Sequence, residues 1–422
     1  MIIPSIDLLG GSTVQLVGGE EQALDAGDPA PLLERFSRVG EVAVIDLDAA
    51  RGEGSNAERI ERLCAQAPCR VGGGIRDVET ARRWLDAGAV QIVIGTAARP
   101  ELLRELPPER VQVALDARDG EVVVEGWRKG TGTTIEERMR ELEGLAGGYL
   151  VTFVEREGRM GGIDLERVEA VVRAAGDARV TVAGGVTTPE EVAAIDRLGA
   201  DAQVGMALYT GRMDLVDAFL APFSSDRPDG LWPTVVTDAR GVALGLAYSD
   251  RESVRTAIED GVGAYHSRKR GLWVKGRSSG ATQRLFRIDP DCDRDALRFS
   301  VEQAGAGFCH RGTRTCFGPD GGIGALARLL AQRADEAPEG SYTRRLFDDP
   351  GLLRSKLVEE AGELADAATP TEVAWEAADV LYFALVACAR AGVDLSAVET
   401  ELDRRSRKVT RRPGDAKPGA DT

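Results

Sequence analysis

Three groups of side chains in the C-terminal half of the chain have the types and spacing of metal ligands. In the first group, Asp291, Asp293 and Asp295 are spaced two residues apart, and Cys292 follows the first of them. The stretch reads as extended backbone, in which alternate side chains share a face, so the carboxylates would face one way and the thiol the other. Clustered carboxylate oxygens suit Mg²⁺ and thiolates suit Zn²⁺. A solvated acidic turn is the alternative interpretation.

Two further thiolates, those of Cys309 and Cys316, follow at a spacing that a loop could bring to Cys292. Three protein ligands leave the fourth position of a tetrahedral Zn²⁺ open for water, and the pKa of that water falls to about 7 on the metal. Such an arrangement is hydrolytic. A closed structural zinc site, with His310 as the fourth ligand, is the alternative that the spacing leaves open.

The third group consists of acids with helical spacing. Glu359, Glu360 and Glu363 fall within one turn, and Glu376 and Asp379 fall within another. Residues three apart share a helix face, and most acids so placed are simply exposed to solvent. Leucine and valine residues surround both groups here, so the acids border the core, where they need a cation. The pattern therefore predicts a Mg²⁺ site.

The first half of the chain carries acids of a different kind, placed at the ends of predicted strands. Short apolar runs alternate with helical patterns from residue 1 to about residue 220, as an α/β domain with a parallel sheet requires. Eight such runs with intervening helices fit a closed (β/α)₈ TIM barrel. The expected strands are Ile2–Ile6, Val42–Leu47, Arg70–Gly72, Gln91–Ile94, Val111–Leu115, Tyr149–Phe153, Arg179–Val182 and Gln203–Gly205.

Asp7 and Asp116 follow the first and fifth of these strands. The C-terminal ends of barrel strands face the active site, so the two carboxylates would oppose each other across the mouth. They could divide the roles of general acid and base if their surroundings separate their pKa values. The alternative is that each aspartate only caps a following loop.

An internal repeat favours the catalytic interpretation. The segment 5–11 recurs as 114–120, and the glycine-rich turns after strands three and four recur after strands seven and eight. Exposed amides in such turns hold phosphate, so the repeat predicts a ligand with a phosphate at each end and a reacting centre between them. The predicted phosphate-binding residues are Gly73, Gly74, Gly95, Thr96, Gly184, Gly185, Gly205 and Met206.

The remaining sequence divides the chain further. After the barrel (1–222), a turn-rich linker leads to a mainly β segment (231–317) with one helix at Ser253–Glu259. A small α+β domain is expected there. Residues 322–406 have helical periodicity and predict an all-α bundle, whereas 407–422 are expected to form a disordered tail.

Composition limits the function classes. The chain has 422 residues, of which 43% are hydrophobic, and a net charge of -16. This length predicts several domains, and the composition is that of a soluble globular protein with no transmembrane segment or signal peptide, so we expect it in the cytoplasm. Its acidity argues against nucleic acid as a partner, whereas small phosphorylated molecules remain compatible. The cysteines are not expected to form disulfides there.

The barrel motifs resemble phosphoribosylformimino-AICAR phosphate isomerase, in the stretches 2–8, 45–50, 72–76 and 116–120 and in Gly126-Trp127. This resemblance implies a metal-free Amadori rearrangement of an aminoaldose to an aminoketose. It implies Asp7 as the base at C2, Asp116 as the acid that opens the ribose ring, and Thr152 as an assisting residue. The chain departs from the family pattern at Gln15, Glu157 and Arg159, where Arg, Asp and a hydroxyl residue are usual.

The middle segment resembles phosphoribosyl-AMP cyclohydrolase, in 267–270, 272–276, 279–280, 291–293 and 309–317. The resemblance implies that zinc hydroxide opens the adenine ring, that Mg²⁺ lies on the aspartate cluster, and that the cysteines come from two chains. It therefore implies a homodimer formed through this domain.

The helical segment resembles phosphoribosyl-ATP pyrophosphohydrolase, in its Glu-Glu-x-x-Glu and Glu-x-x-Asp patterns and in 341–343 and 378–382. The resemblance implies that Mg²⁺ binds the polyphosphate and positions the attacking water, with Lys356 neutralising phosphate charge. The three resemblances name consecutive steps of L-histidine biosynthesis on phosphoribosyl nucleotides. Two alternatives remain, namely a barrel that also isomerises phosphoribosylanthranilate and a barrel that is only a non-catalytic scaffold.

Overall fold

The computed structural model describes residues 1–411 except 20, 125, 159 and 160. The chain divides into two compact units. The first contains Met1–Gly312 and the segment that starts at Arg407, and the second is Thr313–Ser406.

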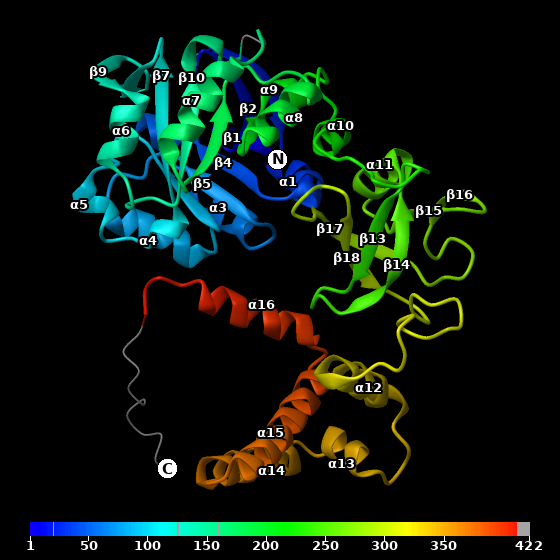
Figure 1. Cartoon of the computed structure of the whole chain (residues 1–422). Coiled ribbons are helices and arrows are strands. Elements are labelled where there is room, and N and C mark those ends of the chain that lie inside the picture. The colour runs from blue at the N-terminus through cyan, green and yellow to red at the C-terminus, as the bar shows by residue number, and fades with distance from the viewer. Residues whose placement is uncertain (20, 125, 159–160, 412–422) are drawn as a thin grey trace. The chain divides into compact units, whose positions relative to one another are not determined.

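Eight parallel strands close into a barrel in the first unit (Figure 1). The pairing of β7 with β10 closes the ring and places Thr152 opposite Asp116. The predicted TIM barrel is confirmed, and seven of its strands lie where the sequence predicts them. The eighth, expected at Gln203–Gly205, begins earlier, as Ala200–Val204, and Gly205 instead precedes the short helix that starts at Met206. In sheet order the strands are β10 (Gly148–Phe153), β11 (Arg179–Ala183), β12 (Ala200–Val204), β1 (Ile2–Leu9), β4 (Val42–Asp46), β5 (Cys69–Gly72), β6 (Gln91–Ile94) and β7 (Val111–Arg118).

Two antiparallel extensions of the sheet were not predicted. Strands β2 (Ser12–Val17) and β3 (Glu21–Gly27) extend β1, whereas β8 (Glu121–Val124) and β9 (Lys129–Thr134) extend β7. Each extension follows the strand that carries one of the two predicted catalytic aspartates. The duplication that the sequence repeat indicates therefore includes these extensions.

Helices surround the barrel strands. Several begin at side-chain caps: the Asp77 carboxylate accepts from Thr80 N at 2.7 Å, and Thr134 and Thr188 form capping boxes, which satisfy amides that have no partner inside the helix. The helices are α1 (Pro29–Phe36), α2 (Leu47–Arg51), α3 (Ala57–Cys64), α4 (Val78–Ala87), α5 (Pro100–Leu103), α6 (Ile135–Glu141), α7 (Leu165–Ala175), α8 (Pro189–Arg197), α9 (Met206–Tyr209) and α10 (Leu215–Leu220), with 3₁₀ turns η1 (Ser37–Val39), η2 (Pro108–Arg110) and η3 (Val154–Arg156).

The first unit also contains a smaller mixed sheet, in the order β14-β13-β18-β17, with a two-stranded ribbon of β15 and β16. The predicted helix is confirmed as α11. Ion pairs join this region to the barrel, since Arg255 lies 3.0 Å from Asp214 and 2.7 Å from Asp217. The bounds are β13 (Trp232–Thr237), β14 (Ala243–Ser249), α11 (Arg251–Asp260), β15 (Ala264–Ser267), β16 (Gly271–Val274), β17 (Gln283–Pro290) and β18 (Leu297–Gln303).

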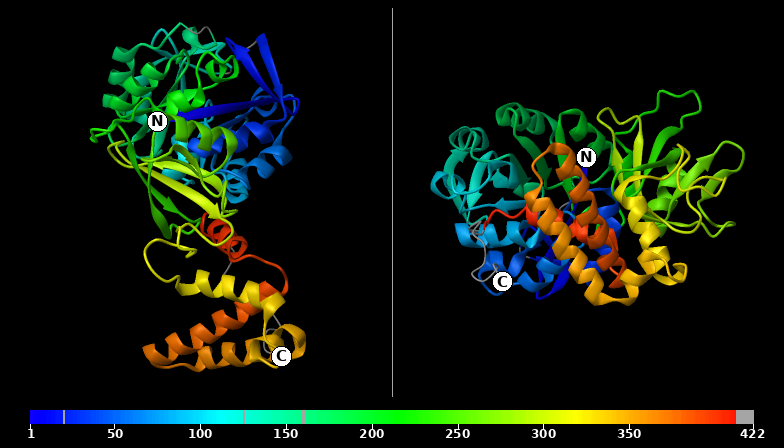
Figure 2. Two further views of the ribbon diagram at one scale, coloured as in Figure 1. Left: turned by 90° about the vertical axis from the view of Figure 1, so that its right-hand side faces the viewer. Right: turned by 90° about the horizontal axis from the view of Figure 1, so that it is seen from below.

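The second unit is helical, as predicted. Its core contains Leu330, Leu346, Phe383 and Val386, which come from three helices of the unit. Figure 2 shows α14 and α15, the helices that carry the predicted magnesium ligands, side by side. The helices are α12 (Gly322–Glu336), α13 (Tyr342–Asp348), α14 (Pro350–Asp366), α15 (Pro370–Arg390) and α16 (Leu395–Ser406).

The chain after α16 was expected to be disordered from residue 407. Its first residues instead contact the barrel: Val409 N donates to Asp86 Oδ1 at 2.8 Å, and Arg110 Nη1 donates to Arg407 O at 3.0 Å. These backbone hydrogen bonds, which composition does not reveal, order residues 407–411. Residues 412–422 lie outside the described part of the chain.

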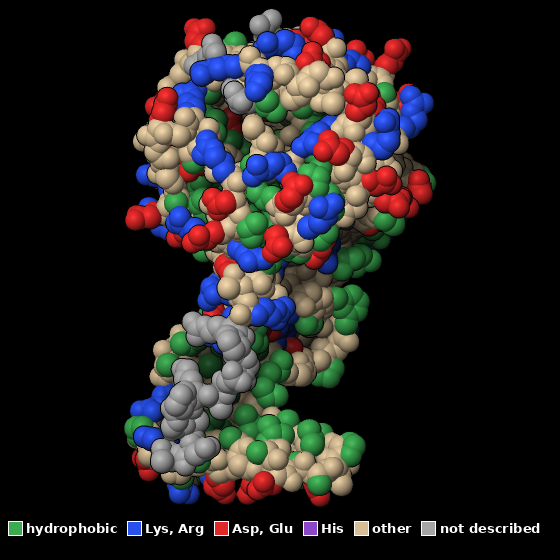
Figure 3. All heavy atoms as spheres, turned by 90° about the vertical axis from the view of Figure 1, so that its left-hand side faces the viewer, with side chains coloured by type: hydrophobic (Ala, Val, Ile, Leu, Met, Phe, Trp, Pro, Cys, Tyr) green, Lys and Arg blue, Asp and Glu red, His purple; other side chains and the backbone are tan. Residues whose placement is uncertain are grey.

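Two surface observations concern larger partners. In the part of the chain that the structure describes, no single helix is long and apolar enough to cross a membrane, although α15 and α16, bent by 113° at their junction, pass that test when taken together. Acidic and basic side chains are interspersed over the barrel face shown in Figure 3.

Candidate active site and metal sites

Asp7 lies at the C-terminal end of β1 in the mouth of the barrel. The Ser5 hydroxyl donates a hydrogen bond to Asp7 Oδ1 at 2.8 Å. Burial raises the pKa of Asp7 to about 6, and the hydrogen bond from Ser5 opposes that rise. A carboxyl with this pKa is mostly ionised at neutral pH and can accept a proton there, which is what a general base near its working pH requires.

Asp116 occupies the corresponding place on β7. Burial raises its pKa, whereas hydrogen bonds from the Trp127 side chain and from Thr152 lower it, and the net shift is upward. The predicted neighbour Thr152 is therefore in contact with Asp116, from the opposite position on β10. Because Asp7 and Asp116 have different hydrogen-bond donors, their protonation can differ, as an acid and base pair requires.

Glu157, which the sequence marked only as a departure from the family pattern, is a third carboxyl in this mouth. Burial raises its pKa to about 7, and the negative charges of Asp7 and Asp116 add to that rise. Its side chain reaches the turn after β11, where a Cβ on Gly184 would lie 3.1 Å from Glu157 Oε2. Two features of the sequence could have identified it: its place in the loop after the sixth strand, and its acidic side chain at a position where the family usually has aspartate.

The glycine-rich turns repeat in three dimensions. Gly73 and Gly184 have positive φ angles of 93° and 85°. A Cβ on Gly73 would lie 2.2 Å from the carbonyl oxygen of Asp46, and one on Gly184 would lie 2.7 Å from that of Phe153. In each half, the turn therefore packs against the end of the preceding barrel strand so closely that only glycine fits.

The second pair of turns is less symmetric. Gly205 and Met206 begin α9, whereas Gly95 and Thr96 lead into a turn without a helix. A Cβ on Gly205 would lie 2.4 Å from Gln15 Oε1, and the buried Gln15 amide donates to Val14 O at 2.9 Å. An uncharged amide therefore lies against this turn at the position where the family usually has arginine. The departure at Arg159 lies outside the described residues.

The aspartate-rich segment is the loop between β17 and β18, and it is a turn. The expected extended conformation was wrong, because Arg294 has a φ of 67° and Asp291 Oδ1 accepts from the amides of Asp295 and Ala296, each at 3.1 Å. The turn still brings the three carboxylates together, since ligand atoms of Asp291, Asp293 and Asp295 lie within 4.8 Å of one another. Such an oxygen cluster suits a hard cation.

The predicted zinc ligands are distributed over both units. Cys292 is exposed on the aspartate-rich loop, with Sγ 3.9 Å from Asp293 Oδ1. Cys309 is half-buried in the first unit, and Cys316 is exposed in the second. Because the sequence resemblance implies that the cysteines of one site come from two chains, one chain is not expected to gather all three thiolates.

In the second unit, Glu360 and Glu363 of α14 and Glu376 of α15 lie together, with ligand atoms within 4.8 Å of one another. Burial raises the pKa of Glu376, and the neighbouring acids, first Glu363, raise it further. Its Oε2 atom is buried and has no hydrogen-bond partner among the described residues. Repelling carboxylates with an unpartnered buried oxygen fit a divalent cation.

The two other predicted ligands of this site lie differently. Glu359 is exposed and pairs with Lys356, whose Nζ lies 2.9 Å from Glu359 and 2.7 Å from Glu360. Asp379 is not in the described cluster of three, although its charge contributes to the raised pKa of Glu376. The geometry thus separates three central acids from two peripheral ones.

Three family models match successive segments of the chain. The model described as histidine biosynthesis protein matches residues 1–214, which is just over half of the chain. The model of phosphoribosyl-AMP cyclohydrolase matches residues 245–318, and that of phosphoribosyl-ATP pyrophosphohydrolase matches 323–406. The predicted order of the three family segments in one chain is therefore confirmed.

Similar proteins carry corresponding names. A histidine biosynthesis bifunctional protein of Schizosaccharomyces pombe is 53% identical over 206 residues, which are 49% of this chain and 49% of that protein. A histidine biosynthesis trifunctional protein of Komagataella pastoris is 48% identical over 58% of this chain and 28% of its own length. An imidazole-4-carboxamide isomerase of Methanocorpusculum labreanum is 39% identical over 52% of this chain and 98% of its own. The chain thus spans about half or less of the first two relatives.

Proposed function

The chain belongs to the histidine biosynthesis protein family, and from this premise we propose that it catalyses three steps on phosphoribosyl nucleotides. The helical segment 322–406 removes pyrophosphate from phosphoribosyl-ATP, and segment 231–317 opens the adenine ring of the resulting phosphoribosyl-AMP. The barrel, 1–222, isomerises the opened aminoaldose to an aminoketose. The observation that carries the proposal is that each segment gathers the acids that its step requires.

In the barrel, the proposed chemistry is proton transfer. Asp7 removes the proton at C2 of the aminoaldose, and Asp116, oriented by Thr152 and Trp127, protonates the ring oxygen as the ribose opens. Both steps need carboxyls that change protonation near neutral pH, and burial raises both pKa values in that direction. The repeated glycine turns would hold the two phosphates, so the reacting carbons lie between the aspartates.

In the middle segment, the donor set fits two metals. Cys292, Cys309 and Cys316 would hold Zn²⁺, and the aspartates of the β17–β18 loop would hold Mg²⁺. A bound zinc supplies hydroxide at neutral pH. Because the resemblance to the cyclohydrolase implies cysteines from two chains, we propose a homodimer formed through this segment.

In the helical segment, Glu360, Glu363 and Glu376 would hold Mg²⁺. Held there, Mg²⁺ would supply positive charge for the polyphosphate and a more acidic water for the attack. Lys356, held between Glu359 and Glu360, presents a positive charge beside that cluster and would pair with phosphate oxygens.

The direct test follows all three steps in one sample. Purified full-length protein with Mg²⁺ and Zn²⁺ is given phosphoribosyl-ATP, and the products are separated by chromatography. We expect pyrophosphate, the ring-opened aminoaldose and the aminoketose. A protein that leaves phosphoribosyl-ATP and phosphoribosyl-AMP unchanged would refute the proposal. Supplying the aminoaldose and phosphoribosylanthranilate separately distinguishes the proposed isomerase from a broader isomerase and from a non-catalytic barrel.

A further inference from the structure

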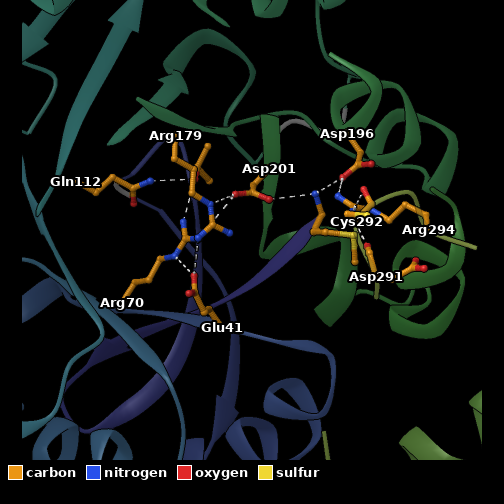
Figure 4. Close-up of polar contacts among 11 residues, drawn as sticks. Glu41, Arg70, Gln112, Arg179, Asp196, Asp201, Asp291, Cys292 and Arg294 are labelled. Carbon is orange, nitrogen blue, oxygen red and sulfur yellow. Dashed lines mark hydrogen bonds and ion pairs between the residues drawn. The ribbon is translucent and has the colours of Figure 1, made fainter. Parts of the chain in front are cut away.

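The floor of the barrel, meaning the N-terminal ends of its strands, contacts the aspartate-rich loop of the cyclohydrolase segment. Arg294 Nη2 lies 2.9 Å from Asp196 Oδ1, and the two side chains are 25% and 12% exposed. Asp196 belongs to the last turn of α8 in the barrel, and Arg294 lies among the predicted metal ligands (Figure 4). This largely buried pair is stronger than an exposed one because solvent screens it less.

Arg294 also holds its own loop. Its Nη1 donates to the carbonyl oxygen of Asp291 at 3.1 Å, with a longer contact of 3.5 Å to that of Cys292. The Arg294 carbonyl accepts from Ser224 N, in the linker, at 3.1 Å. One guanidinium therefore connects the backbone of two predicted ligands to a carboxylate of another enzyme segment.

The barrel side of this connection is rigid. Helix α8 buries Val192 and Ile195 against the barrel core. The α-amino group of Met1 also donates to Asp196 Oδ1, at 2.8 Å. Burial alone would raise the pKa of Asp196, but hydrogen bonds from Arg294 and from the Met1 amine lower it below its usual value. Asp196 therefore stays ionised at neutral pH.

The position of Asp196 also counts against a role in helix stability. A negative charge in the last turn of a helix interacts unfavourably with the helix dipole. The Arg294 guanidinium and the Met1 amine offset that cost from outside the helix. The charge of Asp196 thus serves these two contacts, of which only the one with Arg294 reaches the loop, and not α8 itself.

We propose that Asp196 of the isomerase barrel is a positioning residue for the metal-binding loop of the cyclohydrolase, acting through Arg294. This inference rests on the proposed cyclohydrolase function. The loop carries three carboxylates that repel one another. The Asp196–Arg294 pair, which we call the clamp, holds the loop backbone in the turn that brings these carboxylates together, even without a bound metal. Groups that orient metal ligands in this way typically change metal affinity 10- to 100-fold.

The test compares two variants that each break one interface contact. Asp196→Asn keeps the side chain's shape but removes the charge that holds Arg294. Asp217→Asn is the matched control, because Asp217 also joins the barrel to this segment, through Arg251 and Arg255, without touching the loop. Zinc and magnesium affinities of the full-length protein are measured by competition with a chromophoric chelator, and isomerase turnover reports on the fold.

We expect Asp196→Asn to weaken binding of at least one metal roughly 10-fold, with isomerase turnover unchanged. The control should bind both metals as the wild type does. Arg294→Gln breaks the same ion pair from the loop side, and it replaces Asp196→Asn in the test if Asp196→Asn does not fold. When both variants fold, combining them should weaken binding no further than the stronger single change, since the two residues act through one contact.

The outcomes separate this inference from the proposed function. Unchanged metal affinity in Asp196→Asn, an equal loss in the control, or additive losses in the double variant would overturn the clamp while leaving the cyclohydrolase intact. A wild-type protein that binds neither metal and does not open the adenine ring would refute the proposed function, and with it this inference.

Discussion

The barrel mouth and the helical acid cluster both gather three carboxyl groups, but they control the charge differently. In the barrel, burial raises the pKa of Asp7 to about 6 and that of Glu157 to about 7, so protons can neutralise the group near physiological pH. In the helical unit, Lys356 pairs with only one of the three central acids, Glu360, and Glu376 keeps a buried oxygen without a hydrogen-bond partner among the described residues.

The two sites have the same kinds of side chain, so the burial and the charged neighbours of an acid cluster indicate its chemistry better than its residue types do. Carboxyls neutralised by protons can exchange them, and so carry out acid and base catalysis. Carboxyls that repel one another, one of them with a buried oxygen that has no hydrogen-bond partner among the described residues, offer a cation its ligands, and so can hold a metal. Changes that affect one kind of site and spare the other test this comparison.

Metal removal should produce the largest contrast. We expect prolonged treatment with EDTA to abolish both hydrolytic steps and to leave isomerisation of the aminoaldose at its original rate, because only the barrel step relies on protons alone. Each step is assayed with its own substrate before and after treatment. Restored hydrolysis on adding Mg²⁺ and Zn²⁺ excludes unfolding as the cause. A parallel loss of isomerase activity would contradict the comparison.

Asp7→Asn should break the barrel side alone. The amide cannot accept the proton at C2, so we expect isomerase kcat to fall about 10²- to 10⁴-fold, the usual contribution of a general base. Pyrophosphate release and ring opening should continue at the wild-type rate. Steady-state kinetics with the three substrates check this, and a variant that isomerises normally would remove Asp7 from the mechanism.

Glu360→Gln should break the helical side alone. Loss of one central carboxylate should lower pyrophosphate release roughly 10- to 100-fold at a fixed Mg²⁺ concentration, with partial recovery at higher Mg²⁺, because the change weakens metal binding. Glu359→Gln is the control, since Glu359 also contacts Lys356 but lies outside the central three acids. Equal losses in both variants would indicate that Lys356, and not a metal, links these acids to activity.

The smallest expected effect is a shift in pH dependence. The Ser5 hydrogen bond stabilises the ionised form of Asp7 and so lowers its pKa against the effect of burial. In the wild type, isomerase kcat/KM should decrease as the pH falls through about 6, because protonated Asp7 cannot act as the base.

In Ser5→Ala the pKa of Asp7 should rise further, so the same decrease should begin at a higher pH, while the plateau at high pH changes little. Pyrophosphate release serves as the internal control, since its pH profile should not move. An acid limb that stays in place, or that moves to lower pH, would show that Asp7 does not control it.

Local patterns allowed much of the fold to be predicted. Seven of the barrel strands, the helix α11 and the helical second unit lie where apolar periodicity placed them, and the eighth strand, β12, begins three residues earlier than predicted. The extensions β2–β3 and β8–β9 were missed. For β9, Lys129–Thr134, the physical reason is that the segment is polar and rich in glycine and threonine, and pairing with β8 makes it a strand. The same limit applies to 407–411, whose order depends on Asp86 and Arg110 of the barrel.

By itself, the sequence determined which residues can do chemistry. Its carboxylates, thiolates and glycine turns have spacings that, in a helix or at the end of a strand, put their functional groups on one face or at one edge. Only the tertiary structure decided how those residues are used. It brought Glu157 to Asp7 and Asp116, separated the central acids of α14 and α15 from Glu359 and Asp379, and paired Asp196 with Arg294 across 98 residues of chain. Burial and charge depend on neighbours that are distant in the chain, and no local pattern contains them.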